Sequence, residues 1–289
     1  MKSRLIVPAA LSLLLAAVSA CAVLTSSPGG SAGSACAWEV CVATSEVPGG
    51  RVYEVINREP VPATVQLTFR SLQNLRTATR MPVTRIVPPR SSLPIVRLHT
   101  VVRGRSIGAQ PELMIDLGSS HTEPDSTHLY AVPFGGSDAR ELIQGFDGSD
   151  THRLGMRYAL DFAMPEGTPV LAAREGTVLY VQDGFTTGGR DPDLIERSNL
   201  VVVAHDDGTM ASYGHLSAGI VVRKGDAVRA GDLLGYSGNT GFAGQPHLHF
   251  HVGVRLLGDP GRTVPIQLRG PEGGPLVLEV GSTIEPARP

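Results

Sequence analysis

The segment from Pro246 to His251 constrains the fold of this chain more than any other. Its sequence, Pro-His-Leu-His-Phe-His, has a histidine at every second position. Alternate side chains of a β-strand point to the same face, so a strand here would place all three imidazoles together. Six of the nine histidines lie between His152 and His251. Neutral imidazoles gathered in this way are typical of a metal site, and a solvated strand face that happens to be rich in histidine is the alternative.

The first twenty residues are typical of an export signal. Lys2 and Arg4 provide the positive flank, and an apolar stretch from Leu5 to Ala17 precedes small residues. That stretch is too short to span a bilayer comfortably. We therefore expect residues 1–20 to be a signal peptide and the rest of the chain to function outside the cytoplasm, in the cell envelope.

The residues around Cys21 predict a lipid anchor. Val18-Ser19-Ala20-Cys21 resembles a lipobox, in which Cys21 would be lipidated and become the mature N-terminus. Plain cleavage after Ala20 is the alternative. Residues 21–35 are rich in glycine and serine, which is typical of a flexible tether. The sequence thus predicts a lipoprotein, in the periplasm or on the outer face of a membrane, that contacts the membrane only through this lipid.

The other two cysteines suit an oxidising compartment. If a lipid occupies Cys21, Cys36 and Cys41 remain as a pair that could close a small loop. A free pair is the alternative, because a disulfide across so few intervening residues needs suitable geometry.

Residues 36–128 are predicted to form an accessory domain that resembles a small β-sandwich. Prolines and glycines interrupt short apolar stretches, and no segment has the period of a helix. The clearest strands are expected at residues 52–55, 65–69 and 95–98. We expect His99, His121 and His128 to be surface or locally bonded residues.

Residues 129–289 are predicted to form a second all-β domain, an antiparallel sheet with a C-terminal extension. Strands are expected at 170–173 and 177–181, on either side of Glu175-Gly176. Two more, at 200–204 and 209–213, flank Asp206-Asp207-Gly208, which indicates a hairpin.

The second domain contains the residues that a catalytic zinc would need. Such a zinc commonly takes three protein ligands and keeps a fourth position for water. The candidates are His152, Asp161 and one or more of the clustered histidines. In a strand Asp161 would share a face with Ala159 and Ala163, which leaves room for a metal and a substrate. An acid at a strand edge or turn is the alternative.

Several motifs occur together, and in order, between about Gln144 and Val254. They are His152, Tyr158–Val170, Tyr213–Leu216, Gly225–Gly231 and His247–Phe250. In this combination they resemble the lysostaphin-type (LytM-like) zinc metallopeptidases, peptidoglycan endopeptidases with a His-x-His motif. The resemblance covers well under half of the chain.

The resemblance implies a role for each of five residues. It makes His152, Asp161 and His249 the zinc ligands, and it makes His215 and His247 the catalytic histidines that deprotonate the attacking water or stabilise the oxyanion. Strand alternation alone does not choose between His247 and His249, because both could reach one metal. One feature departs from the family, since His152 precedes Asp161 by nine positions where many members have four.

Three further side chains lie near these motifs. We expect His205 to be structural. His251 is expected to line the cleft or to be incidental. Tyr213 either donates a hydrogen bond near the site or packs its ring.

Other function classes are disfavoured. The formal net charge is −2 with charges interspersed, so no nucleic-acid partner is expected. The segment Gly235–Asn239 lacks the second glycine of a serine-hydrolase elbow. The expected function is therefore a zinc metalloendopeptidase that hydrolyses the peptide cross-links of peptidoglycan. The alternative is a non-catalytic LytM-like module that binds a protein partner and regulates a cell-wall hydrolase.

Overall fold

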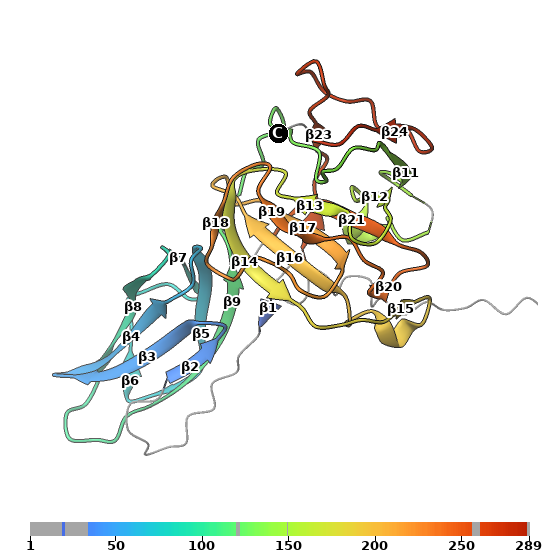
Figure 1. Cartoon of the computed structure of the whole chain (residues 1–289). Helices are drawn as coiled ribbons and strands as arrows, with labels where there is room; N and C mark the ends of the chain where they lie inside the picture. The colour runs from blue at the N-terminus through green and yellow to red at the C-terminus, as the bar shows by residue number, and fades with distance from the viewer. Residues whose placement is uncertain (1–18, 21–33, 120–121, 149, 256–260, 288–289) are drawn as a thin grey trace, which may run out of the picture. The chain divides into compact units, whose positions relative to one another are not determined.

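The computed structural model describes residues 19–20, 34–119, 122–148, 150–255 and 261–287 (Figure 1). The predicted signal peptide apart from Ser19 and Ala20, the predicted lipid site Cys21, the tether up to residue 33, and His121 lie outside these residues. The described residues form two compact units, one of 19–20, 34–119 and Arg255, the other of 122–254 and 261–287. Residues 122–128, which the sequence placed in the first domain, group with the second unit.

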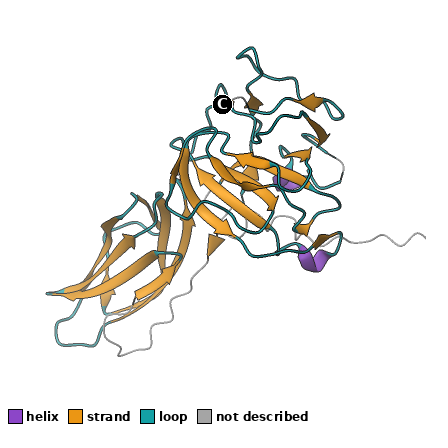
Figure 2. Ribbon diagram, viewed as in Figure 1, coloured by secondary structure: helices purple, strands orange, loops and turns teal. Residues whose placement is uncertain are grey.

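The protein is all-β, as predicted. Figure 2 shows strands in both units, and the only helical segments among the described residues are the short 3-10 turns η2 (Leu154–Met156) and η3 (Pro192–Leu194). No helix in this part of the chain is long and apolar enough to cross a membrane.

The first unit consists of two antiparallel sheets. One has the order β1–β9–β5–β7 and the other β2–β3–β4–β8–β6. The strands are β1 (Ser19–Ala20), β2 (Ser34–Ala37), β3 (Val40–Val47), β4 (Gly50–Asn57), β5 (Ala63–Gln73), β6 (Leu75–Arg76), β7 (Val83–Val87), β8 (Ser91–Thr100) and β9 (Gly108–Leu117). The strands expected at 52–55, 65–69 and 95–98 lie inside β4, β5 and β8.

Apolar side chains from both sheets of the first unit are buried together. Val55 and Leu98 come from one sheet and Leu67 and Ile115 from the other, and all four are fully buried. The ring of Tyr53 meets the ring of Phe69 from the other sheet edge-on, with centroids 5.2 Å apart. This packing is that of a β-sandwich.

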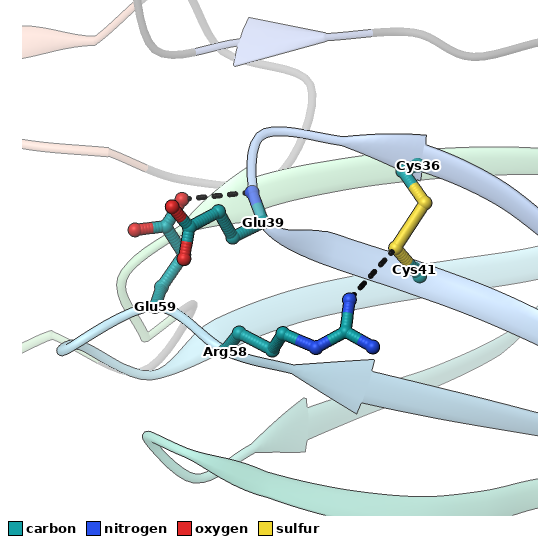
Figure 3. The surroundings of a disulfide bond; sticks show 5 residues. All are labelled: Cys36, Glu39, Cys41, Arg58 and Glu59. Carbon is teal, nitrogen blue, oxygen red and sulfur yellow. Dashed lines mark hydrogen bonds between the residues drawn. A yellow bond between two sulfur atoms is a disulfide. The ribbon is translucent and has the colours of Figure 1, made fainter.

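A disulfide closes the first hairpin of this unit. Cys36 and Cys41 lie directly opposite each other on β2 and β3, with Cα atoms 4.0 Å apart, and their sulfurs are bonded (Figure 3). The buried carboxylate of Glu59 accepts a hydrogen bond from the backbone N–H of Glu39 in the hairpin turn, at 2.9 Å. The structure therefore joins the pair that the sequence left open.

The second unit is built on one large sheet. Its strand order is β18–β14–β16–β17–β21–β12–β11–β24, with β22 also paired to β21. The strands of the unit are β10 (Leu129–Tyr130), β11 (Arg140–Gln144), β12 (Leu160–Ala163), β13 (Pro169–Leu171), β14 (Gly176–Gln182), β15 (Gly188–Gly189), β16 (Asn199–Ala204), β17 (Met210–Leu216), β18 (Ala227–Val228), β19 (Leu233–Tyr236), β20 (Gly241–Phe242), β21 (His247–Val254), β22 (Arg262–Thr263), β23 (Gln267–Leu268) and β24 (Thr283–Ile284). The predicted hairpin is formed by β16 and β17.

The centre of this sheet is buried on both faces. Every residue of β16, β17 and β21 is buried. On β21, Leu248, Phe250 and Val252 belong to the hydrophobic core, so alternation sends the three histidines to the opposite face. The strand of alternating histidines is thus fixed in register by the apolar residues between them.

Tyr213 belongs to the core rather than to the site. Its ring packs against Phe250, with centroids 5.1 Å apart, and its hydroxyl accepts a hydrogen bond from the backbone N–H of Ala173 at 2.8 Å. Of the two interpretations of Tyr213, packing is the one that the structure supports.

Candidate metal centre

The sheet register places an aspartate directly opposite a histidine. Asp161 on β12 pairs with His249 on β21, and Gly214 on β17 flanks His249 on its other side. Two residue pairs along, Ala163 lies opposite His247. Because Gly214 and Ala163 are small, they leave the space beside the acid and the imidazoles open.

Three side chains converge on one point. Asp161 Oδ1 lies 2.8 Å from His249 Nδ1, and Asp161 Oδ2 lies 3.2 Å from His152 Nε2. One ligand atom from each of the three residues lies within 4.8 Å of the other two, and all three residues are buried. The structure therefore brings together the three residues that the family resemblance named as ligands.

The donor set fits zinc. His152 Nδ1 lies 2.8 Å from the backbone carbonyl of Gly145, which can only accept, so Nδ1 carries the proton. His152 Nε2 is buried and has no hydrogen-bond partner in the described structure, which leaves its lone pair for a metal. Two imidazole nitrogens and one carboxylate oxygen are ligands that catalytic zinc commonly takes.

The carboxylate of this centre is held in its ionised form. Burial by itself raises the pKa of Asp161, but the imidazoles of His152 and His249 beside its two oxygens hold the pKa well below its usual value. An ionised acid is required for metal binding, so Asp161 needs no deprotonation step at neutral pH.

Two more histidines stand beside the candidate ligands. The rings of His215 and His247 are 4.5 Å apart, and His247 Nε2 lies 3.9 Å from Asp161 Oδ1. Each has its Nδ1 close to a backbone carbonyl, that of Thr240 at 2.7 Å for His215 and that of Gln245 at 2.8 Å for His247. Since carbonyls only accept, both Nδ1 atoms are protonated and both Nε2 atoms are free to accept a proton.

His215 is held in an unusual backbone conformation. Its φ is +62°, in the left-handed region that non-glycine residues rarely adopt, and its backbone N–H donates to Ser198 Oγ at 3.1 Å. Burial, together with the charges of His247 and His249, lowers the pKa of His215 to about 3. The imidazole is therefore neutral at pH 7.

Gln144 connects two of the candidate ligands, and the sequence did not single it out. Its side-chain nitrogen donates to Asp161 Oδ2 at 2.9 Å and to Thr151 Oγ1 at 2.7 Å. Its side-chain oxygen accepts from the backbone N–H groups of Asp150, at 3.2 Å, and Thr151, at 3.3 Å. One amide thus ties the segment that carries His152 to the acid on β12.

This connection gives a physical reason for the long spacing between the first two ligands. Gln144 ends β11 directly opposite Asp161, and the chain then loops out before it returns His152 to the acid. The turn η2 follows and leads into β12. The spacing of nine residues is therefore compatible with a compact centre.

His251 lies behind His249 rather than in the cleft. Its Nδ1 is 3.1 Å from His249 Nε2, and the side chain is almost wholly buried. If a metal took His249 Nδ1, the proton of His249 would lie on Nε2 and could be donated to His251 Nδ1. His205 lies at the end of β16, where its Nδ1 donates to the carbonyl of Glu175 at 2.7 Å, as a structural residue would.

The site opens into a cleft of about 490 Å³. Asp161, His215, His247 and His249 line it together with Arg190 and Phe242. A cleft of this size can hold a short stretch of peptide.

A family assignment agrees with this geometry. Residues 155–260 match the model of peptidase family M23. The chain contains a peptidase family M23 domain. His152 lies three residues before the matched segment, whereas the other four site residues lie within it. Members of family M23 are zinc metallopeptidases, and the donor set of this M23 domain suits that metal.

Three curated relatives share part of the chain. Peptidoglycan DD-endopeptidase ShyA of Vibrio cholerae is 39% identical over 105 residues, which are 36% of this chain and 22% of that protein. DD-carboxypeptidase/endopeptidase Mpg of Neisseria meningitidis is 34% identical over 121 residues, 42% of this chain and 25% of that protein. Lysostaphin of Staphylococcus simulans is 41% identical over 97 residues, 33% of this chain and 18% of that protein. The chain thus spans a quarter or less of the length of these relatives.

Proposed function

We propose that this protein is a zinc metalloendopeptidase that hydrolyses peptide cross-links of bacterial peptidoglycan. The observation that carries the proposal is the convergence of His152, Asp161 and His249, beside two histidines with free Nε2 atoms. The names of ShyA and Mpg, which describe endopeptidases, supply the reaction class. The name of ShyA supplies the substrate class.

Each residue of the centre has a proposed role. His152 Nε2, Asp161 and His249 Nδ1 would hold a zinc ion. When bound, zinc lowers the pKa of water and polarises a carbonyl. His215 and His247 face the cleft, so one accepts the proton of the attacking water through Nε2 and the other stabilises the developing oxyanion. The same two imidazoles return the proton to the leaving amine.

A regulatory, non-catalytic role is the competing proposal. One relative is named for a cellular process and not for a hydrolytic activity: Cell division protein DipM of Caulobacter vibrioides, 37% identical over 93 residues. A module that only binds a partner has no need for three ligands and two bases in one cleft. All five residues are in place here, which favours the enzyme.

The location and the domain roles are proposed along with the activity. We propose that the protein is exported and that a lipid on Cys21 and the tether of residues 21–35 hold the peptidase in the cell envelope. Mass spectrometry of the mature N-terminus separates lipidation of Cys21 from plain cleavage after Ala20.

Digestion of purified peptidoglycan tests the activity directly. The zinc-loaded protein is expected to release muropeptides whose masses, measured by mass spectrometry, identify the cleaved bond. The protein stripped of metal by a chelator is expected to release none until zinc is restored. A protein that binds one zinc ion per chain yet releases no muropeptide, alone or with a wall extract, would favour the regulatory role.

A further inference from the structure

One long segment of the first unit contains basic residues but no acidic ones. Residues 60–111 contain eight arginines and no aspartate or glutamate. Since the whole chain has a net charge of −2, this positive segment is balanced by acidic residues elsewhere. The arginines are Arg70, Arg76, Arg80, Arg85, Arg90, Arg97, Arg103 and Arg105.

Four of these arginines belong to one end of the β-sandwich. Arg76 on β6 lies opposite His99 on β8, and Arg97 is two residues from His99 on the same face. The chain then leaves β8 at Thr100 and enters the loop that holds Arg103 and Arg105 (Figure 1). All four arginines are exposed, and none of them forms an ion pair among the residues that the structure describes.

Two apolar side chains project from the same loop. Val101 is 57% exposed and Val102 is 44% exposed. We call the segment Val101–Arg105 the Val-Arg loop. Exposed valines next to exposed arginines, without any acid, form a surface that is both apolar and cationic.

The Val-Arg loop is held in this form by one asparagine. Asn74, with φ of +53°, donates from its side chain to the carbonyls of Val102 at 2.9 Å and Arg105 at 3.1 Å. Its side-chain oxygen accepts from the N–H of Val102 at 2.8 Å, and its backbone carbonyl accepts from the N–H of Val101 at 3.1 Å. Because the backbone is tied down in this way, the exposure of the valines is part of the folded structure.

We propose that the Val-Arg loop, together with Arg76 and Arg97, binds the surface of an anionic phospholipid membrane. Guanidinium groups pair with lipid phosphates in a bidentate manner, and basic residues near an anionic leaflet gain attraction from its surface potential. Val101 and Val102 enter the boundary between headgroups and acyl chains, as apolar residues of interfacial segments do. A soluble polyanion would use the arginines but would have no use for the valines.

Vesicle binding by the full chain tests this surface. A Cys21→Ser background removes any lipid anchor, and co-sedimentation is measured with vesicles of phosphatidylcholine alone or mixed with phosphatidylglycerol. We expect binding to the mixed vesicles only. Arg103→Gln/Arg105→Gln and Val101→Ser/Val102→Ser should each weaken it by about tenfold or more.

A matched control uses the same arginine-to-glutamine change elsewhere in the segment. Arg85 on β7 pairs with Val65 on β5. Arg90 lies directly before the first residue of β8, and the Val-Arg loop begins directly after its last residue. The ten residues of β8 separate Arg90 from the loop by about 33 Å. Arg85→Gln/Arg90→Gln should therefore keep most of the binding.

Three results would overturn the proposal. Equal binding to both kinds of vesicle would remove the need for anionic lipid. An equal loss in the control variant would show that charge acts diffusely. The surface would be assigned to a wall polymer instead if two results came together. The valine variant would bind the vesicles as the wild type does, and the wild-type protein would also bind a soluble teichoic acid.

Discussion

At the scale of single residues, His249 and His215 occupy the same cleft but have different chemistry. His249 directs Nδ1 at Asp161, whereas His215 contacts only backbone and hydroxyl groups through its Nδ1. The first arrangement suits the metal ligand that we propose, and the second suits the base that we propose. Substitution should therefore separate zinc binding from turnover.

We predict that His249→Ala abolishes both zinc binding and peptidoglycan digestion. His215→Ala should retain one zinc ion per chain and lose at least about a hundredfold in rate, because a positioned base typically contributes that much. Zinc content by elemental analysis and muropeptide release are the measurements. Parental digestion by the His215 variant would show that the proposed roles are wrong.

A second prediction concerns Gln144, which touches no substrate in the proposed mechanism. Gln144→Ala removes the bond to Asp161 and the support of the segment before His152. Loss of such a supporting contact typically weakens metal binding by about 10- to 100-fold. We expect the zinc dissociation constant to rise by that factor, as measured by competition with a chelating dye.

Gln245→Ala is the matched control for Gln144. Gln245 also lines the cleft, but it serves His247 through its backbone carbonyl, which the substitution keeps. The zinc dissociation constant of the Gln245→Ala variant should equal that of the parent protein. If both variants bound zinc like the parent, Gln144 would have no part in holding the metal centre.

At the scale of elements, the end of the β16–β17 hairpin contains a histidine that resists protonation. His205 is buried, and burial, together with the charge of Arg174, lowers its pKa to about 4. The unfolded chain has a pKa of about 6.5 at this residue. A lowered folded pKa means that the stabilisation is complete above about pH 6.5 and is lost as the pH falls toward 4.

We therefore predict that His205→Gln reduces the pH dependence of stability. Between pH 7 and pH 4 the wild-type M23 domain should lose up to about 3 kcal/mol of unfolding free energy through this residue. Urea unfolding at several pH values is the measurement. His99→Gln, an exposed histidine on β8, should keep the wild-type dependence. If the difference in unfolding free energy between wild type and His205→Gln did not change with pH, the lowered pKa of His205 would not be the cause of the pH dependence.

At the scale of the whole molecule, the first unit contributes no residue to the candidate metal centre. The five site residues and the core around them all lie in the second unit. Residues 122–128 belong with that unit, because Thr122 and Asp125 hydrogen-bond to Gly208 and Asp207. A deletion should therefore end at residue 121.

We predict that deletion of residues 36–121 leaves the hydrolysis of a soluble cross-link peptide within about threefold of the full chain, since effects of this size are under 1 kcal/mol. Attachment to walls or membranes should fall much more. Peptide hydrolysis followed by chromatography is the measurement, with His215→Ala in the same deletion as the inactive control. A folded deletion variant without hydrolysis would show that the first unit takes part in the reaction.

The sequence by itself predicted the all-β class, several of the strands and the candidate residues of the site. Alternation in Val65–Phe69 and in His247–His251 was sufficient to predict strands, because period-two patterns report burial on one face. The turn residues Asp206-Asp207-Gly208 predicted the hairpin for a local reason. The motif resemblance named the residues that the structure brings together.

Only the tertiary structure decided which distant groups meet. Whether Gln144 reaches Asp161 depends on the register of β11 against β12, and whether His251 backs His249 depends on side-chain conformations inside a closed sheet. The Cys36–Cys41 bond and the core position of Tyr213 were likewise settled by strand pairing and packing. The physical reason is that period and propensity act locally, whereas register and contact depend on how the whole apolar core closes.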